Sequence, residues 1–198
     1  MTMYVDNEKV ILTDCDGVLL DWEYKFHSWM SDRGYVLGPR QNETYDIAEK
    51  YGIEKKLSKQ LVRAFNESAS VGKLPPLRDA IKYVKKLHEE HGYVFHCITS
   101  MSLSKDAYYL RLQNLEDVFG KTVFERLVCL DTGADKDEAL LPYKNSDCWW
   151  FEDKPENADL GVEYGLNTLL VAQAHNSDYN GPAKRVQSWK DIYEEVTG

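Results

Sequence analysis

Two aspartates, Asp14 and Asp16, stand one residue apart directly after a short apolar run at residues 10–13. Side chains alternate in direction along a strand, so both carboxylates are expected to point the same way from a strand end. Carboxylates this close raise each other's pKa unless a cation lies between them, and Mg²⁺ is a hard cation that carboxylates bind well. One carboxylate could then attack as a nucleophile while the other transfers protons. The pair therefore predicts a Mg²⁺-dependent catalytic site.

Two other interpretations of this segment are weaker. A calcium-binding loop would need an oxygen ligand where Val18 stands and a glutamate where Lys25 stands, so the pattern excludes it. A solvated acidic turn is the usual meaning of an isolated pair of aspartates. Three further polar elements at the ends of predicted strands argue against it here.

Those three elements each follow an apolar run. They are Thr99-Ser100 after the run that ends at Ile98, Lys136 after residues 127–130, and Glu152-Asp153 after residues 149–151. Hydroxyl groups with free backbone N–H groups can hold phosphate oxygens, a lysine can neutralise a phosphate, and acidic residues can complete a Mg²⁺ shell. Each signal is weak alone, but the carboxyl ends of parallel strands are where open α/β sheets bind ligands. Lys144 is the alternative to Lys136; we favour Lys136 because it follows a strand more directly.

The remaining pattern predicts an α/β fold. Apolar runs at residues 10–13, 93–98, 127–130, 149–151 and 168–171 alternate with helical periodicity, which indicates a parallel sheet covered by helices. About 80 residues separate the first two strands, too many for a simple crossover, and helical patterns at 22–33 and 54–68 fill most of them. We therefore expect a catalytic core of residues 1–20 and 74–198, with a small helical cap at residues 21–73.

Composition excludes several classes of protein. The 198 residues carry 24 Lys+Arg against 33 Asp+Glu, and this net charge of −9 argues against bulk nucleic-acid binding and against a polybasic membrane surface. No apolar run is long enough to span a bilayer, and the N-terminus lacks the pattern of a secretory signal. The four cysteines have no zinc-site spacing, which is typical of reduced thiols in a cytoplasmic protein. P-loop and GxGxxG motifs are absent as well.

The order of these elements resembles the haloacid dehalogenase (HAD) superfamily of phosphatases. The resemblance implies a Rossmann-like three-layer sandwich with a five-stranded parallel sheet in the order 3-2-1-4-5. It also implies a phosphoaspartyl mechanism, with Asp14 as nucleophile and Asp16 as general acid and base. By the same resemblance Thr99, Ser100 and Lys136 bind the phosphoryl group, while Asp14, the backbone carbonyl of Asp16, and Asp153 bind Mg²⁺. An acid at Asp16 points to phosphatases, because true dehalogenases lack it.

A narrower resemblance, to the 5′(3′)-deoxyribonucleotidases, rests on the second half of the chain. It covers residues 98–100, 119–120 and 135–136, the pair His175-Asn176, and the segment 185–191. It implies a small-molecule substrate, a nucleoside monophosphate and preferably a deoxy one. Residues 68–73 contain no aromatic ring where that family stacks the nucleobase, and Glu152-Asp153 replaces its usual two aspartates. The base pocket is therefore expected to be altered or supplied by another segment.

The predicted cap offers aromatic side chains of its own. Trp22, Phe26 and Trp29 share one helical face, and they either pack the cap onto itself or, for Trp22 or Phe26, line the substrate pocket beside Asp14. Alternative functions are a phosphatase for another small phosphorylated metabolite or for a nucleic-acid end, and a non-catalytic phosphate- or Mg²⁺-binding module. The sequence leaves the oligomeric state open.

Overall fold

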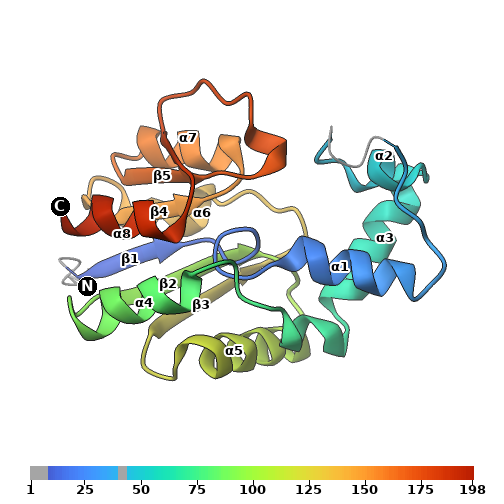
Figure 1. Ribbon diagram of the computed structural model, residues 1–198, viewed down its shortest axis with the longest axis horizontal. Helices are drawn as coiled ribbons and strands as arrows, with labels where there is room; N and C mark the ends of the chain where they lie inside the picture. The colour runs from blue at the N-terminus through green and yellow to red at the C-terminus, as the bar shows by residue number, and fades with distance from the viewer. Residues whose placement is uncertain (1–8, 40–43) are drawn as a thin grey trace.

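A computed structural model of the chain describes residues 9–39 and 44–198. Residues 1–8, where no secretory signal is expected, and residues 40–43 of the predicted cap lie outside the described residues. The described chain forms a parallel sheet with helices on both faces and a group of helices beyond one end (Figure 1). Among the described residues, no helix is both long and apolar enough to cross a membrane.

The sheet of the described chain has six strands, all parallel, in the order β3-β2-β1-β4-β5-β6. Their bounds are β1 Val10–Thr13, β2 Val94–Ser100, β3 Phe124–Leu130, β4 Trp149–Glu152, β5 Asn167–Val171 and β6 Lys184–Val186. The expected order 3-2-1-4-5 is confirmed for the first five strands, but the expected number of five is wrong. β6 escaped prediction because it has three residues and begins with Lys184 and Arg185, so it forms no apolar run.

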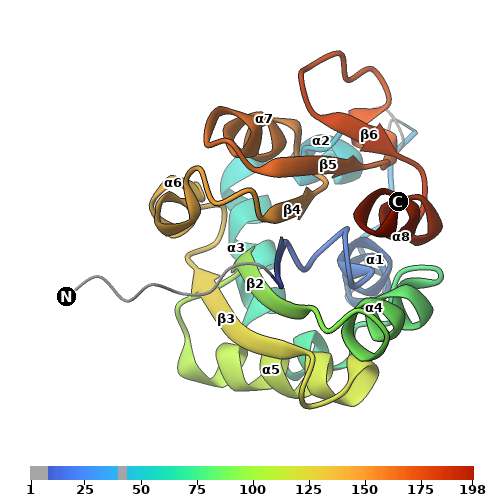
Figure 2. The same ribbon diagram turned by 90° about the vertical axis from the view of Figure 1, so that its left-hand side faces the viewer.

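Helices cover both faces of this sheet, as the end-on view in Figure 2 shows. One face carries α4 (Ala80–Glu89), α5 (Lys105–Phe119) and α8 (Trp189–Thr197), and the other carries α6 (Asp137–Leu140) and α7 (Pro155–Glu163). The central strand β1 is buried at all four positions, with Ile11 in one apolar cluster and Leu12 in the other. Burial on both faces explains why the strands read as continuous apolar runs.

The segment predicted as the cap contains α1 (Trp22–Ser31), α2 (Ile47–Tyr51) and α3 (Lys55–Asn66), which lie beyond the carboxyl ends of the strands (Figure 1). Short 3₁₀ turns are η1 (Ala69–Lys73) after α3, and η2 (Leu141–Tyr143) and η3 (Ala174–Asn176) in the core. The two connections between core and cap are paired: Asp21 N donates to Pro75 O at 2.8 Å, and Leu77 N donates to Leu19 O at 2.9 Å. The side chain of Asp21 also accepts from Tyr24 N, which caps α1.

Aromatic rings hold α1 and α3 together. Trp22 stacks on Phe26 with ring centroids 4.5 Å apart, and Phe65 of α3 meets both rings edge-on at 5.4 and 5.3 Å. Phe26 is fully buried, whereas Trp22 keeps part of its surface open. Phe26 therefore packs inside the cap, whereas Trp22 packs against Phe26 with one face and keeps part of its surface exposed.

Candidate active site

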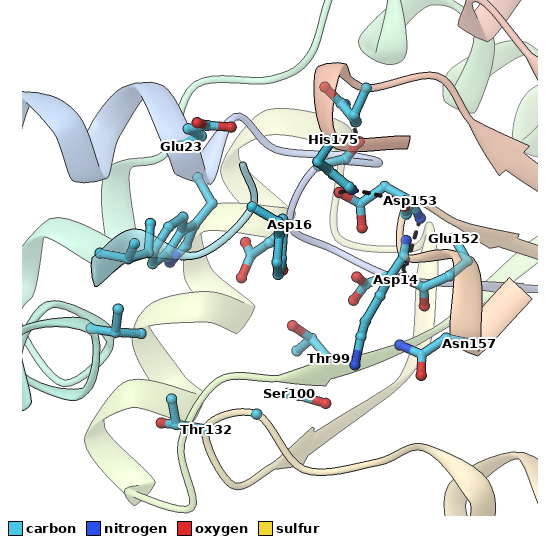
Figure 3. Close-up of a pocket in the computed structure, with 18 of the residues that line it drawn as sticks. Asp14, Asp16, Glu23, Thr99, Ser100, Thr132, Glu152, Asp153, Asn157 and His175 are labelled. Carbon is cyan, nitrogen blue, oxygen red and sulfur yellow. Dashed lines mark hydrogen bonds and ion pairs between the residues drawn. The ribbon is translucent and has the colours of Figure 1, made fainter. Parts of the chain in front are cut away.

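Polar side chains from four strand ends converge on one cavity of about 350 Å³ (Figure 3). Asp14 follows β1, and Thr99 and Ser100 are the last residues of β2. Lys136 is the N-cap residue of α6, in the segment after β3, and Glu152 ends β4 with Asp153 next to it. The hydrogen bond from Asp14 N to Phe151 O, at 2.8 Å, ties the first of these loops to the fourth strand. The structure thus brings together the four elements that the sequence predicted at separate strand ends.

Lys136 lies at the centre of this group. Its ammonium Nζ is 2.8 Å from Asp14 Oδ1 and 2.7 Å from Glu152 Oε2, and the residue is only 2% exposed. Both carboxylates raise the pKa of Lys136 and keep it charged, although burial alone would lower it. Lys144, the alternative, is exposed and lies over the ring of Tyr164 at 4.9 Å from its centroid.

Three buried carboxylates surround this lysine with an excess of negative charge. Ligand oxygens of Asp14, Glu152 and Asp153 all lie within 4.8 Å of one another. Burial raises the pKa of Asp14 to about 7 against the opposing effect of Lys136, and burial together with Glu152 raises the pKa of Asp153 well above its usual range. Three carboxylates and one ammonium leave a deficit of positive charge in a site shielded from water. Oxygen ligands in this arrangement fit Mg²⁺.

Glu152 holds the site together through both of its oxygens. Oε2 contacts Lys136, and Oε1 accepts from the backbone N–H groups of Asp153 and Lys154 at 3.2 and 3.1 Å. Asp153 in turn packs against Gly17, where an added Cβ would lie 2.2 Å from Asp153 Oδ2. Gly17 also has a positive φ of 78°. A glycine is therefore required for the loop after β1 to approach Asp153.

Asp16 differs from the other acidic residues. Its side chain lines the cavity, but it lies outside the cluster of three carboxylates that the described residues form (Figure 3). Both of its oxygens are held by the guanidinium of Arg111, with Nη2 to Oδ2 at 3.1 Å and Nη1 in contact with Oδ1. The prediction assigned only the backbone carbonyl of Asp16 to the metal, so the place of its side chain outside the cluster does not test it. Glu152 takes the third place in the cluster.

A second layer of hydrogen bonds fixes the loop of Asp153. His175 Nε2 lies 3.0 Å from Asp153 O, and Asn176 Nδ2 donates to the same carbonyl and to Val171 O at 2.8 Å each. Arg185 Nε donates to Asn176 Oδ1 at 3.0 Å, which links β6 to this loop. The pair His175-Asn176, noted in the sequence through a resemblance, therefore positions the acidic loop by holding its backbone.

Two further contacts tie the same region to the loop after β1. Trp189 Nε1 donates to Val18 O at 2.8 Å, and Gln173 Nε2 donates to Gly17 O at 2.6 Å. Sequence reasoning missed Gln173, which stands in a short polar loop with no pattern to mark it. It also missed Arg111, although Arg111 and Asn114 share the buried face of α5 with Ala107 and Leu115. Polar residues on an otherwise apolar helix face were the sequence signal that could have identified Arg111 as a buried polar contact.

The cap forms the opposite wall of the cavity. Trp22 lines it, and Trp22 Nε1 donates to Asn66 Oδ1 at 2.9 Å. Ile47 and Val62 add apolar surface, and the ion pair of Glu23 with Lys50 adds charge. Phe26 does not belong to the residues that line the cavity. The floor of the cavity is thus charged and comes from the core, whereas the facing wall comes from the cap and combines apolar side chains with the Glu23–Lys50 ion pair.

Comparisons with known proteins identify the fold that holds this site. No protein-family model matches the sequence. One curated relative, an uncharacterized 32.4 kDa protein from the Gp30–rIII intergenic region of Enterobacteria phage T4, is 27% identical over 195 residues, covering 94% of this chain and 69% of the relative.

Solved structures match over nearly the whole chain. A haloacid dehalogenase-like family hydrolase from Streptococcus pneumoniae has a TM-score of 0.66 at 13% identity, covering 96% of this chain and 98% of its own. A HAD family hydrolase from Deinococcus radiodurans, with bound phosphate and sodium, has a TM-score of 0.61 at 15% identity, covering 95% and 94%. An L-2-haloacid dehalogenase from Xanthobacter autotrophicus, with chloropropionic acid covalently bound, has a TM-score of 0.61 at 12% identity, covering 96% and 98%. The chain therefore has the α/β fold of the haloacid dehalogenase-like hydrolases.

Proposed function

We propose that this protein is a Mg²⁺-dependent phosphomonoesterase that works through a phosphoaspartyl intermediate on Asp14. The observation that carries the proposal is the contact of Lys136 with Asp14, inside a buried acidic cluster at the floor of a cavity. A neutralised carboxylate beside hydroxyl groups, at the carboxyl ends of parallel strands, suits the binding and transfer of a phosphoryl group. The phosphate bound to the D. radiodurans hydrolase of the same fold supports this assignment.

The proposed reaction has two steps. In the first step Asp14 attacks phosphorus, an Oδ–P bond forms, the ester P–O bond breaks, and Asp16 donates a proton to the leaving oxygen. In the second step Asp16 removes a proton from water, the water oxygen attacks phosphorus, and the Oδ–P bond breaks to release inorganic phosphate. Lys136 and Thr99 hold the oxygens of the transferring group.

Asp14 and Asp153 would hold the Mg²⁺ with their side chains, while Glu152 keeps Lys136 and the Asp153 loop in place. When bound, the metal supplies positive charge that offsets the clustered carboxylates and the oxygens of the phosphoryl group. Ser100 donates its hydroxyl to Ala134 O at 2.7 Å, so its side chain braces the loop that leads to Lys136. Its backbone remains beside Thr99 at the end of β2, where the phosphate is expected.

We further propose a nucleoside monophosphate as the substrate, preferably a deoxy one. The cavity has room for a planar organic leaving group, and its cap wall offers the indole of Trp22 with the apolar side chains of Ile47 and Val62. Residues 68–73 lack an aromatic ring, and the cap lines the cavity with two others, Trp22 and Tyr45. We expect Trp22 of α1 to stack on the base, because the ring of Tyr45 already packs on His175. The alternatives remain another small phosphorylated metabolite or a nucleic-acid end.

The experiment that tests the function is release of inorganic phosphate with Mg²⁺ from a panel of 5′- and 3′-deoxynucleotides, ribonucleotides, sugar phosphates and 4-nitrophenyl phosphate. Asp14→Asn serves as the control, and we expect it to fold and to lose turnover. A clear preference for deoxynucleoside monophosphates supports the full proposal. Activity on other esters alone retains the phosphatase and rejects the nucleotide substrate. No release from any ester by the wild-type protein rejects the enzyme and favours a binding module.

A further inference from the structure

Arg111 is a fully buried charge at the back of the active site. It belongs to the middle of α5, and its exposed surface is 0%. Its guanidinium grips Asp16 with both terminal nitrogens, and Nη1 also lies 2.7 Å from Cys15 Sγ, the residue between the two catalytic aspartates. The third nitrogen, Nε, is buried and makes no hydrogen bond to any described atom. Burying a charged group with one donor unsatisfied is costly, so a contribution to folding alone explains it poorly.

The two partners of this ion pair face different surroundings. Asp16 lines the cavity and its side chain is 23% exposed, whereas Arg111 is absent from the residues that line the cavity. Arg111 therefore cannot touch a substrate there, and any effect on the reaction passes through Asp16. A carboxylate has about four lone-pair positions on its two oxygens, and a two-pronged guanidinium contact uses only the inner two. Arg111 therefore leaves the outer positions of this cavity-lining carboxyl without a hydrogen bond.

We propose that Arg111 is a positioning residue that holds the Asp16 carboxyl in the orientation needed to protonate the leaving group. This inference rests on the proposed phosphatase function. The two terminal nitrogens of the planar guanidinium fix the plane of the carboxyl group, which the single nitrogen of an ammonium cannot do. Its positive charge also favours the carboxylate that Asp16 becomes when the proton passes to the leaving oxygen. In the second step the same contact presents that carboxylate to the attacking water.

The dependence on the leaving group separates positioning from simple structural support. An alkoxide leaving group needs a proton as its bond to phosphorus breaks, whereas 4-nitrophenolate leaves without one. The ratio kcat/KM reports the steps up to the release of the leaving group. The later attack of water on the phosphoaspartyl intermediate therefore does not affect it. General acid catalysis contributes about 10²–10⁴-fold. A variant that disorients Asp16 should therefore lose kcat/KM mainly on alkyl phosphates.

The test compares Arg111→Met with the wild-type protein in Mg²⁺, using an alkyl phosphate ester from the panel and 4-nitrophenyl phosphate. We expect kcat/KM to fall roughly 100-fold on the alkyl ester and less than about 3-fold on the aryl ester. Asp16→Asn should show the same selectivity, and adding Arg111→Met to it should cause no further loss on the alkyl ester, because the two residues act as one unit. Arg111→Lys keeps the positive charge but not the two-nitrogen contact. It should also lose more kcat/KM on the alkyl ester than on the aryl ester, by a smaller factor than Arg111→Met.

Asn114→Ala is the matched control. Asn114 lies one turn further along α5, is 3% exposed, and bonds the backbone of Leu74 through both of its side-chain atoms, at 2.8 and 3.1 Å. We expect it to lower stability and to change both substrates by the same factor. If Arg111→Met also lowers both substrates equally, the positioning role is overturned while the phosphatase stands. If Arg111→Met fails to fold, equal losses for Arg111→Lys overturn it in the same way. If the wild-type protein hydrolyses no ester, the proposed function itself fails.

Discussion

The two walls of the cavity are built by different means. On the core side, Asp14, Lys136 and Glu152 are all buried and are joined by ion pairs of 2.7–2.8 Å. On the cap side, apolar side chains lie beside the Glu23–Lys50 ion pair, and one of the contacts that span the two parts is the ion pair of Arg63 with Asp131 at 2.9 Å, in which both side chains are about half exposed. Exposed ion pairs contribute about 0–1 kcal/mol, whereas breaking a buried one costs about 3–5 kcal/mol. The core-side residues are thus held by buried ion pairs, whereas this ion pair between cap and core is exposed and contributes little.

The largest effect should come from the centre of the core wall. Lys136→Ala leaves Asp14 and Glu152 without their shared ammonium, so we expect a loss of about 3–5 kcal/mol in unfolding free energy and of at least ~10²-fold in kcat. Chemical denaturation and phosphate release measure the two quantities. Lys144→Ala, the matched lysine on the surface, should change stability by less than about 0.5 kcal/mol. Loss of turnover in Lys144→Ala with an active Lys136→Ala would reverse the assignment.

The contact of Gly17 with Asp153 should give the next largest effect. In Gly17→Ala the new Cβ meets Asp153 Oδ2 and the backbone keeps an unfavourable positive φ, so the loop and the carboxylate must move apart. We expect a stability loss of about 1–3 kcal/mol and a weaker increase of the melting temperature on addition of Mg²⁺. Gly34→Ala, at a positive φ with open space around its Cβ, is the control for backbone strain alone. An unchanged Mg²⁺ response in Gly17→Ala would show that this contact does not shape the metal site.

Substitution of Trp22 on the cap wall tests selection of the leaving group. Trp22→Ala removes the ring that faces the cavity, and we expect KM for nucleoside monophosphates to rise about 10-fold, because a base–aromatic stack contributes about 1–3 kcal/mol. KM for 4-nitrophenyl phosphate should change much less. Phe26→Leu alters the neighbouring ring that does not line the cavity, so it should lower stability without this selectivity. Equal losses on both substrates in Trp22→Ala would assign Trp22 to packing alone.

The contact between the two parts should give the smallest effect. Arg63→Gln removes the ion pair with Asp131, and we expect less than about 1 kcal/mol in unfolding free energy. We expect KM to change little. The loss of stability should shrink in high salt, because exposed charges are screened. Arg78→Gln, at an exposed arginine paired with its neighbour Asp79, is the control. A loss in kcat as large as that of Lys136→Ala would contradict the distinction between the two walls.

The core wall was more predictable from sequence than the cap wall. Asp14, Thr99 and Asp153 stand at or close to the end of an apolar run, and Lys136 lies in the loop after another. Parallel strands bring their carboxyl ends to one edge, so local patterns were sufficient to bring these residues together. Which of Trp22 and Phe26 faces the cavity depends on how α1 is rotated over the core, and the sequence carries no signal for that rotation.

Two other features depend on tertiary context in the same way. Arg111 was hidden inside a regular helical pattern, where its partner Asp16 is 95 residues away in the chain. The short edge strand β6 has too few apolar residues for its alternation to be recognised, and it forms only because β5 offers it an edge. Glu152 was identified as acidic, but its contact with Lys136 could be known only once β3 and β4 were placed.

The paired connections at Asp21–Pro75 and Leu19–Leu77 have a consequence for how this molecule can change over evolution. Because the chain leaves and rejoins the core at adjacent points, the intervening segment is a closed loop whose ends are already fixed. The entropy of closing such a loop grows only slowly, by about 0.6 kcal/mol for each doubling of its length. Segments of quite different size and sequence can therefore be exchanged at this point without disturbing the sheet. Replacing this one segment would change a wall of the cavity while the core-side residues stay where they are.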